Sequence, residues 1–394
     1  MVAMPTEESL AMIERLIAFD TTSSLSNLEL IDDIKAMLEA EGIPCTLVHN
    51  KEGTKANLIA EIGPQDTPAI IVSGHTDVVP ADSAQWTVTP PFQARRLDGR
   101  LYGRGSADMK GFIGIALSKL IPLHHQLKTS SVILALSFDE ELGCLGAPLM
   151  MPNLRDLAPR LRGAIIGEPT EMRIGNAHKG HIAARATIIG KGGHSGYPER
   201  GINAIDLAAE LITHLRRFGI QKRLDQRDSR FDPPYSTVHT GLIQGGSALN
   251  KIPDRCTFDF EMRTLPDQRP DELLDQVREA FPDGLAEDIQ PLARQASLEL
   301  ECTGQYPQLN ETCSSYLHWI AELTQGDATP MPLGFGCEAG LFAQLGIPAV
   351  VCGPGSIHQA HLPDEYITLD QISACEAFFE RLITHLHAGL PSFN

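Results

Sequence analysis

Residues 69–77 read Ala-Ile-Ile-Val-Ser-Gly-His-Thr-Asp, an apolar run that ends in a histidine and an aspartate. Further continuous apolar runs lie at residues 132–136, 164–166 and 348–352. Short runs without alternation are typical of strands that are buried on both faces, as in a parallel sheet covered by helices. We expect helices before and between these strands, over residues 7–19, 28–41 and 111–123. The two ends of the chain therefore predict an α/β domain with helices on both faces of a mostly parallel sheet.

The middle of the chain has a different pattern. Apolar and polar residues alternate strictly from Cys256 to Arg263, and residues 182–188 and 297–302 alternate as well. Alternation indicates an antiparallel sheet with one buried and one solvated face. Two amphipathic helices are expected beside this sheet, over 203–218 and 270–281, with the charged stretch 221–234 as a connection. We predict a smaller α+β domain, residues 181–306, inserted into a larger domain formed by residues 1–180 and 307–394.

The length and the net charge of the chain bear on its number of domains and on its partners. The chain has 394 residues, which exceeds the roughly 250–300 residues at which a single core stops growing. Its 32 Lys and Arg against 50 Asp and Glu give a net charge of −18, which would repel a phosphate backbone. The pairs Arg95-Arg96 and Arg216-Arg217 are too isolated to form a basic patch. We therefore expect no nucleic-acid partner.

Cysteine usage and the N-terminus bear on localisation. The eight cysteines are scattered and include no C-x-x-C pair, so they do not suggest a disulfide framework. The first ten residues lack the basic and apolar regions of a signal peptide. No stretch approaches 18 uninterrupted apolar residues. We expect a soluble, cytoplasmic protein with no membrane partner.

Acidic residues and histidines follow every apolar run. They are His75 and Asp77 after the first run, Asp139-Glu140-Glu141 after the second, Glu168 after the third, and His358 and His361 after the fourth, with Asp108 between the first two runs. Ligands of open α/β sheets bind beyond the carboxyl ends of the strands. Each acid taken singly also suits an ordinary turn or helix start. Their coincidence at four strand ends predicts a metal pair, because carboxylates crowded together without a cation would repel one another.

In these segments the sequence resembles the co-catalytic di-zinc aminoacylase and carboxypeptidase family of metallopeptidases. The resemblance extends from about residue 22 to 366, in the order of the family. The matching segments are residues 73–80 (Ser-Gly-His-Thr-Asp-Val-Val-Pro), 103–111 (Gly-Arg-Gly-Ser-Ala-Asp-Met-Lys-Gly), 139–143, 167–170, 192–196 and 245–250.

The resemblance implies a site with two Zn²⁺ ions, for which Co²⁺ is an accepted substitute. It implies five metal ligands: His75 and Glu168 for one ion, Glu141 and His361 for the other, and Asp108 as the bridge. Asp77 would hold the imidazole of His75 in its ligating tautomer, and Glu140 would be the general base and acid. His358, three residues before His361, is the alternative for the last ligand.

The resemblance also assigns roles to the insert. It implies a lid and dimerisation domain, and hence a homodimer, in which His194 stabilises the oxyanion on closure, from the same chain or from its partner. Asn250 and Arg263 would bind the α-carboxylate of the substrate, since the planar fork of arginine suits a carboxylate. A cross-strand salt bridge on the exposed face of the sheet is the alternative for Arg263.

The C-terminal segments narrow the expected substrate. Residues 336–340, 352–356 and 359–366 are similar to the branch of the family that deacetylates N-acetyl-L-ornithine, in arginine biosynthesis. Glu338 would bind the δ-amine of that substrate, or it is simply an acid at the start of a helix. Cys337 stands where this branch more often has threonine. We expect hydrolysis of a small N-acyl amino acid; the alternatives are a broad deacylase, a succinyl-diaminopimelate desuccinylase, or a metal-free binding protein.

Overall fold

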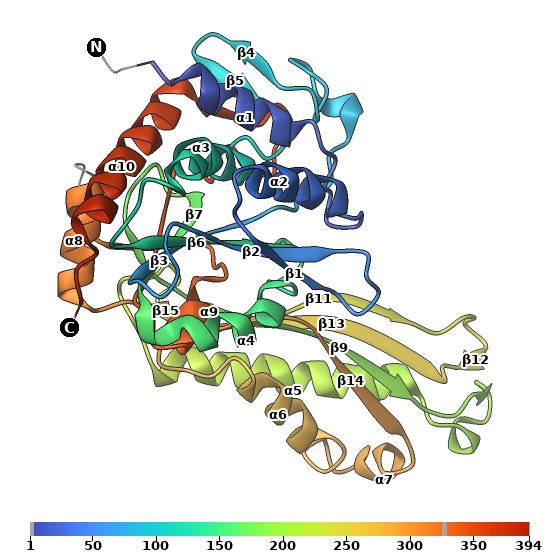
Figure 1. Ribbon diagram of the computed structural model, residues 1–394. Coiled ribbons are helices and arrows are strands. Elements are labelled where there is room, and N and C mark those ends of the chain that lie inside the picture. The colour runs from blue at the N-terminus through green and yellow to red at the C-terminus, as the bar shows by residue number, and fades with distance from the viewer. Residues whose placement is uncertain (1–3, 325–328, 394) are drawn as a thin grey trace. The chain divides into compact units, whose positions relative to one another are not determined.

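The structure is a computed structural model that describes residues 4–324 and 329–393. The chain divides into two compact units (Figure 1). Unit 1 consists of Met1–Ala177, Leu309–Leu333 and Cys337–Asn394, and unit 2 of His178–Gln308 and Gly334–Gly336. Unit 2 thus contains the predicted insert, residues 181–306, together with residues 178–180, 307–308 and 334–336. No helix among the described residues is long and apolar enough to cross a membrane.

The centre of unit 1 is a set of four parallel strands. In spatial order they are β6 (Ser131–Ser137), β3 (Ala69–His75), β7 (Leu161–Pro169) and β17 (Ala349–Gly353). Every residue of β3, β6 and β17 is buried. This burial on both faces explains the continuous apolar runs, and it confirms the predicted fold class.

Further strands extend the sheet on both sides. β1 (Cys45–His49) and β2 (Ala56–Ile62) form an antiparallel pair, and β2 also runs antiparallel to β6. Beyond β17 lie β8 (Gly175–His178), β15 (Leu309–Asn310) and β16 (Met331–Pro332). A separate small sheet contains β4 (Arg95–Leu97), β5 (Arg100–Tyr102) and β18 (Tyr366–Thr368).

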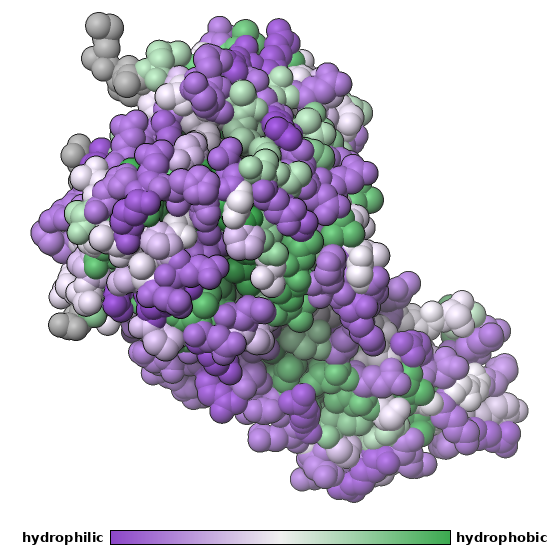
Figure 2. All heavy atoms as spheres, in the orientation of Figure 1, coloured by the Kyte–Doolittle hydropathy of each residue, from purple (hydrophilic) through white to green (hydrophobic). Residues whose placement is uncertain are grey.

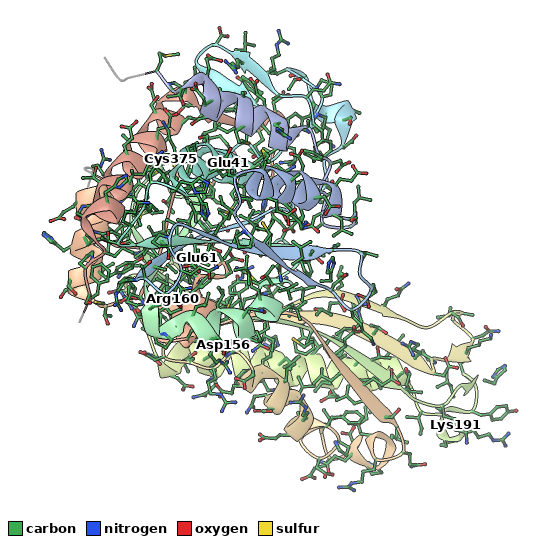
Figure 3. All side chains as sticks on the ribbon, viewed as in Figure 1. Glu41, Glu61, Asp156, Arg160, Lys191 and Cys375 are labelled. Carbon is green, nitrogen blue, oxygen red and sulfur yellow. The ribbon has the colours of Figure 1, made fainter. Side chains whose placement is uncertain are left out.

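Helices cover both faces of the large sheet (Figure 1). One face carries α1 (Glu7–Ile17), α2 (Leu28–Ala40), α3 (Lys110–Leu120) and α10 (Leu369–Ala388), and α8 (Ser314–Thr324) packs against α10. The other face carries α4 (Ala147–Leu157) and α9 (Ala339–Gln344). Beside α4, Arg160 forms a two-pronged ion pair with Glu61 of β2, at 2.6 and 2.8 Å (Figure 3). In the space-filling view, hydrophilic residues cover most of the visible surface of unit 1 (Figure 2).

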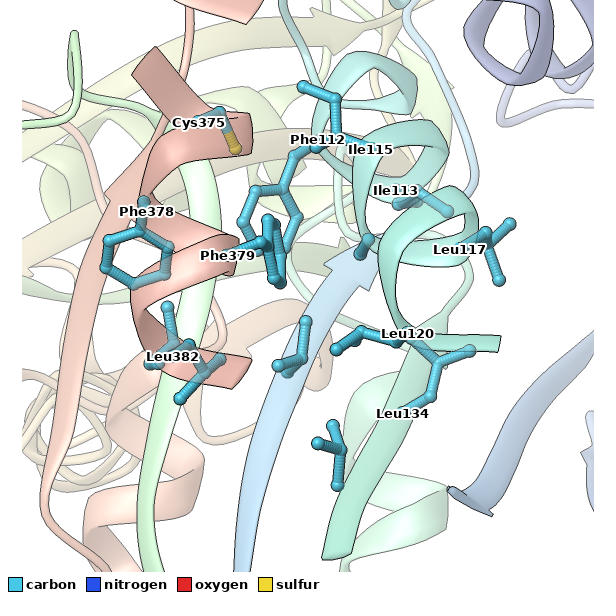
Figure 4. Close-up of a cluster of buried hydrophobic side chains, with 14 of the residues drawn as sticks. Phe112, Ile113, Ile115, Leu117, Leu120, Leu134, Cys375, Phe378, Phe379 and Leu382 are labelled. Carbon is cyan, nitrogen blue, oxygen red and sulfur yellow. The ribbon is translucent and has the colours of Figure 1, made fainter. Parts of the chain in front are cut away.

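The core of unit 1 includes a cluster of buried side chains where α3 meets α10 (Figure 4). The rings of Phe112 and Phe379 lie 5.6 Å apart, between centroids, and Leu134 of β6 belongs to the same cluster. On another side α3 contacts α1 through Gly114, where an added Cβ would lie 2.8 Å from Ile13 Cγ1. A glycine inside this helix therefore lets the two helix backbones approach closely. This packing holds α3 in place, and α3 begins two residues after Asp108.

Unit 2 contains an antiparallel sheet. Its strand order is β11 (Thr237–Gly245), β13 (Arg255–Thr264), β9 (Gly180–Ile189) and β14 (Ser297–Tyr306). α5 (Ala204–Asp225) and α6 (Glu272–Ala280) form a core with this sheet. The alternation along β13 holds: Cys256, Phe258, Phe260 and Met262 are buried. Shorter elements are β10 (Gly193–His194), β12 (Lys251–Ile252) and α7 (Gln290–Ala293).

One expected boundary in unit 2 is wrong. Residues 221–225 belong to α5, whereas the sequence pattern assigned them to the connection 221–234. The cause is a tertiary contact, because the Lys222 ammonium donates to both carboxylate oxygens of Glu272 in α6, each at 2.9 Å. The local pattern, which is polar and charged, contains no sign of this partner.

Candidate metal centre

The carboxyl ends of the parallel strands in unit 1 bring six titratable side chains together. They are His75 at the end of β3, Asp108 before α3, Glu140 and Glu141 after β6, Glu168 near the end of β7, and His361 after β17. Parallel strands finish at one edge of the sheet, so residues far apart in the chain become neighbours there.

Asp108 lies between the two histidines. Its Oδ1 is 2.9 Å from Nε2 of His75, and its Oδ2 is 3.2 Å from Nε2 of His361. Glu141 Oε1 lies 3.1 Å from the same Nε2 of His361. The two oxygens of one carboxylate thus face two different imidazoles, as a ligand shared by two ions requires. In the described structure the ring of His358 has no hydrogen bond or ion pair with this cluster.

The donor atoms fit divalent cations. Two overlapping sets have their donor atoms within 4.8 Å of one another: His75, Glu140 and Glu168, and His75, Asp108 and Glu141. Oε1 of Glu168 is buried without a hydrogen-bond partner in the described structure, and it lies 3.7 Å from Nε2 of His75. Imidazole nitrogens and carboxylate oxygens are ligands that Zn²⁺ and similar ions accept. A cation would also compensate this orphaned oxygen.

The carboxyl groups of the cluster are difficult to ionise together. Burial raises the pKa of Glu168 well above its usual value, and the negative charge of Asp108 adds to this effect. Burial raises the pKa of Glu140 to about 8, with Glu141 among the neighbouring charges that contribute. Like charges in a desolvated site disfavour each other's ionised form. A divalent cation removes this repulsion.

The neighbouring carboxylates favour the charged form of the two histidines. Burial lowers the pKa of His75, but hydrogen bonds to Asp108 and Asp77 outweigh burial and raise that pKa well above its usual value. Hydrogen bonds to Asp108 and Glu141 raise the pKa of His361 to about 10. The nitrogen atoms of both imidazoles thus face carboxylate oxygens, with which they could share a divalent cation.

Asp77 makes hydrogen bonds that orient other residues of the cluster. The Nδ1–H of His75 donates to the backbone carbonyl of Asp77 at 2.9 Å, and the Asp77 carboxylate lies 3.6 Å away from this nitrogen. This bond leaves Nε2 directed at Asp108. The same carboxylate accepts from the Ser23 hydroxyl at 2.7 Å and from the backbone N–H groups of Glu140 and Glu141 at 3.1 and 3.3 Å. Asp77 therefore orients the turn after β6 as well as the histidine.

Two contacts of this site are not predicted by the sequence pattern. The Cys144 thiol donates to Oε1 of Glu140 at 3.3 Å. The buried carboxylate of Glu365 contacts the loop that leads to Asp108. Glu365 stands in the segment 359–366 that resembles the family, and this was the one available signal.

Glu338 has a structural environment of its own. Its side chain is buried, and its two oxygens accept from the hydroxyls of Ser73 in β3 and Ser137 in β6, at 2.5 and 2.7 Å. Burial raises the pKa of this carboxyl, and the two hydroxyls oppose the rise. Glu338 thus ties neighbouring strands together directly before their metal-site residues. Binding of a substrate amine by Glu338 stays a prediction.

Three of the predicted residues belong to unit 2. His194 is exposed in β10, and its Nδ1 accepts from the Gly196 N–H at 3.0 Å. Asn250 is exposed in the loop before β12, where its carbonyl accepts from the Ser195 N–H. Arg263, near the end of β13, donates to Glu261 at 3.3 Å. Arg263 thus forms a salt bridge, but with a residue of its own strand and not the cross-strand bridge considered as its alternative.

Comparison with known proteins adds to this geometry. Residues 71–385 match the model of peptidase family M20/M25/M40. The chain belongs to this family. It is therefore a metal-dependent amidohydrolase. An acetylornithine deacetylase from Myxococcus xanthus is 35% identical over 96% of this chain and 97% of its own length, and one from Pasteurella multocida is 33% identical over 96% and 98%.

Solved structures of the family share the fold. A metallo-carboxypeptidase of the M20 family from Sulfolobus solfataricus superposes with a TM-score of 0.75 at 17% identity, over 97% of this chain and all of the other. A dinuclear metal-binding peptidase of the same family from Bacillus subtilis has a TM-score of 0.63 at 18% identity, over 97% and 98%. At these identities the likeness concerns the fold alone.

Proposed function

We propose that this member of the M20/M25/M40 family hydrolyses N-acetyl-L-ornithine to L-ornithine and acetate with two Zn²⁺ ions. The observation that carries the catalytic part is the placement of Asp108 between the imidazoles of His75 and His361. The substrate is inferred from the relatives, because proteins that are 33–35% identical over 96% of this chain are acetylornithine deacetylases.

The proposed ligand set follows the contacts of unit 1. His75 and Glu168 would hold one ion, Glu141 and His361 would hold the other, and Asp108, which contacts both histidines, would be shared between them. Two divalent ions held there would polarise the amide carbonyl and lower the pKa of the attacking water. Asp77 maintains the tautomer of His75 through its backbone carbonyl.

Glu140 is the proposed general base and acid. It takes a proton from the attacking water and later delivers it to the α-nitrogen of the departing ornithine, so that acetate and a free α-amine result. Burial raises the pKa of this carboxyl above that of an exposed glutamate, which favours a group that must both accept and release a proton. Glu140 also belongs to one of the two donor sets, so its alternative is a metal ligand.

The remaining parts of the proposal concern substrate and context. His194 stabilises the oxyanion, Asn250 and Arg263 bind the α-carboxylate, and Glu338 pairs with the δ-amine. The protein acts in arginine biosynthesis in the cytoplasm, as a homodimer. Two exposed apolar side chains on the edge strand β11, Leu242 and Ile243, support the homodimer.

The test is a substrate panel under metal control. The protein is stripped with a chelator and reconstituted with Zn²⁺ or Co²⁺. Hydrolysis of N-acetyl-L-ornithine, N-acetyl-L-methionine and N-succinyl-diaminopimelate is then followed by release of the free amine. We expect no turnover after chelation and restored turnover with metal, with the highest kcat/KM for N-acetyl-L-ornithine.

Two results would contradict parts of this proposal. Restored activity that is led by acetyl-methionine or by the succinyl substrate would keep the metal centre and discard the ornithine assignment, in favour of a broad deacylase or a desuccinylase. Metal binding without hydrolysis of any of the three amides would discard the ornithine substrate together with both alternatives.

A further inference from the structure

The carboxylate of Glu365 is buried in unit 1 and makes four hydrogen bonds. Its residue is only 1% exposed, and each of the two oxygens accepts two hydrogen bonds. Oε2 accepts from Nη1 of Arg104 at 2.8 Å and from the Gly105 N–H at 3.0 Å. Oε1 accepts from the N–H groups of Ala107 and Asp108, at 2.9 and 3.2 Å. Arg104, which balances its charge, is itself 2% exposed.

These bonds shape the loop that ends on Asp108. Three backbone N–H groups within four consecutive residues point at one carboxylate, so the backbone curls around it like an anion-binding nest. Gly105 has φ +84, a left-handed conformation that glycine adopts without strain. The backbone carbonyl of Glu365 also accepts from the Gly103 N–H at 3.0 Å. Without the carboxylate, these buried donors would lack acceptors.

The same residue belongs to the segment that carries His361. His361 and Asp364 have φ values of +64 and +53, a conformation that residues other than glycine rarely adopt. The segment therefore needs bonds from outside to hold its shape. Glu365 supplies one set, and Asp364 supplies another by accepting from the N–H groups of Thr87 and Val88, at 2.9 and 3.0 Å.

We propose that Glu365 is a positioning residue for the metal pair: its buried carboxylate joins the loop of Asp108 to the segment of His361. It thereby fixes the distance between the bridging carboxylate and the last histidine. This inference rests on the ligand assignment made above. Glu365 is not one of the proposed ligands; it acts through the Arg104 side chain and the backbone of residues 105–108.

Glu365→Gln is the informative substitution. In either orientation of the new amide, its NH₂ group would face backbone N–H donors, because both oxygens of the carboxylate accept from the backbone. At least one donor would stay unpaired and the ion pair with Arg104 would be lost. Substitution of groups that orient metal ligands reduces metal affinity by about 10- to 100-fold.

The matched control is Glu376→Gln. Glu376 is another buried carboxylate of unit 1, 5% exposed, which accepts from the Thr6 N–H at 3.1 Å and from the Ser9 hydroxyl at 2.6 Å. It has no hydrogen bond or ion pair with a candidate ligand in the described structure. Both variants lose a buried charge and its bonds, but only one of them is connected to Asp108 and His361.

The experiment compares the full-length wild-type protein with both variants. It measures the affinity for Zn²⁺ by competition with a chelator, the visible absorption spectrum of the Co²⁺ form, and the thermal midpoint. For Glu365→Gln we expect Zn²⁺ binding weakened by about 10- to 100-fold, and an altered Co²⁺ spectrum. We also expect a lower kcat with little change in KM. Glu376→Gln should lose thermal stability only.

Wild-type affinity and an unchanged Co²⁺ spectrum in Glu365→Gln would overturn the inference. If that variant does not fold, Arg104→Lys takes its place, since it removes the guanidinium bond and keeps the backbone N–H bonds. A shifted Co²⁺ spectrum in Arg104→Lys supports the inference, and a wild-type spectrum overturns it. Failure of the wild-type protein to bind any divalent metal would instead refute the proposed function, and the inference with it.

Discussion

Glu140 illustrates how two adjacent acids acquire different partners. Its backbone N–H and that of Glu141 both donate to the Asp77 carboxylate, so the turn after β6 is held rigidly. From this turn, Glu141 contacts His361, whereas Glu140 accepts a hydrogen bond from the Cys144 thiol. A division between a ligand and a general base is consistent with these contacts.

We therefore predict that Glu140→Gln lowers kcat by about 10²- to 10⁴-fold, the usual contribution of general base catalysis. The metal content should remain two ions per chain, because Glu141 and not Glu140 is the proposed ligand. Steady-state kinetics and elemental analysis of the same preparation check both parts. Loss of one ion per chain would identify Glu140 as a ligand, and unchanged kcat would exclude it as the base.

His178 couples the stability of unit 2 to pH. Its side chain is fully buried, its Nδ1–H donates to the Lys179 carbonyl at 2.9 Å, and its Nε2 has no partner in the described structure. Burial lowers its pKa to about 4, compared with 6.5 for an ordinary histidine. The unfolded chain therefore binds a proton more readily than the folded chain between pH 6.5 and 4. Stability is lost as the pH falls through this window.

We predict that His178→Asn, which keeps a donor near the Nδ1 position but does not titrate, removes this pH dependence. Between pH 7.5 and 5, the free energy of unfolding of the wild-type protein should fall by about 2 kcal/mol more than that of the variant. Urea unfolding at the two pH values measures the difference. An equal fall in both proteins would show that His178 does not titrate differently in the folded and unfolded chains.

At the scale of elements, β11 is an edge strand in which no residue is buried. It forms one edge of the four-stranded sheet, and the register against β13 shifts between Thr240 and Leu242. Leu242 is 66% exposed and Ile243 is 56% exposed, although adjacent residues of a strand point to opposite faces. An uncovered edge with exposed apolar side chains favours pairing with another strand.

We predict that the protein is a dimer in solution and that Leu242→Lys weakens it, because a buried ammonium at a strand edge opposes pairing. Light scattering during gel filtration at several concentrations measures the change. Leu149→Lys is the control, since Leu149 is an exposed leucine of α4 in unit 1. A monomeric wild-type protein would contradict the proposed homodimer, and an intact Leu242→Lys dimer would place its interface elsewhere.

For the whole molecule, the strands show how much of the fold can be predicted from the sequence. The apolar runs at 69–72, 132–136, 164–166 and 348–352 correspond to β3, β6, β7 and β17, and unit 2 has the alternating strands that were expected. These strands can be predicted from the sequence because burial on one or two faces of a sheet determines the residue types along a strand. The end of α5 could not be predicted from the sequence, because it depends on the contact between Lys222 and Glu272.

The sequence by itself determined the fold class and the kinds of residue at the metal centre, since chemistry-bearing side chains follow buried parallel strands at a common edge. The tertiary structure alone decided which side chains meet. It brings His361, and not His358, to Glu141 across 220 residues of chain, encloses Glu338 between two serines, and wraps the loop before Asp108 around Glu365. The physical reason is that such contacts join segments distant in the chain, so no local pattern of burial or charge encodes them.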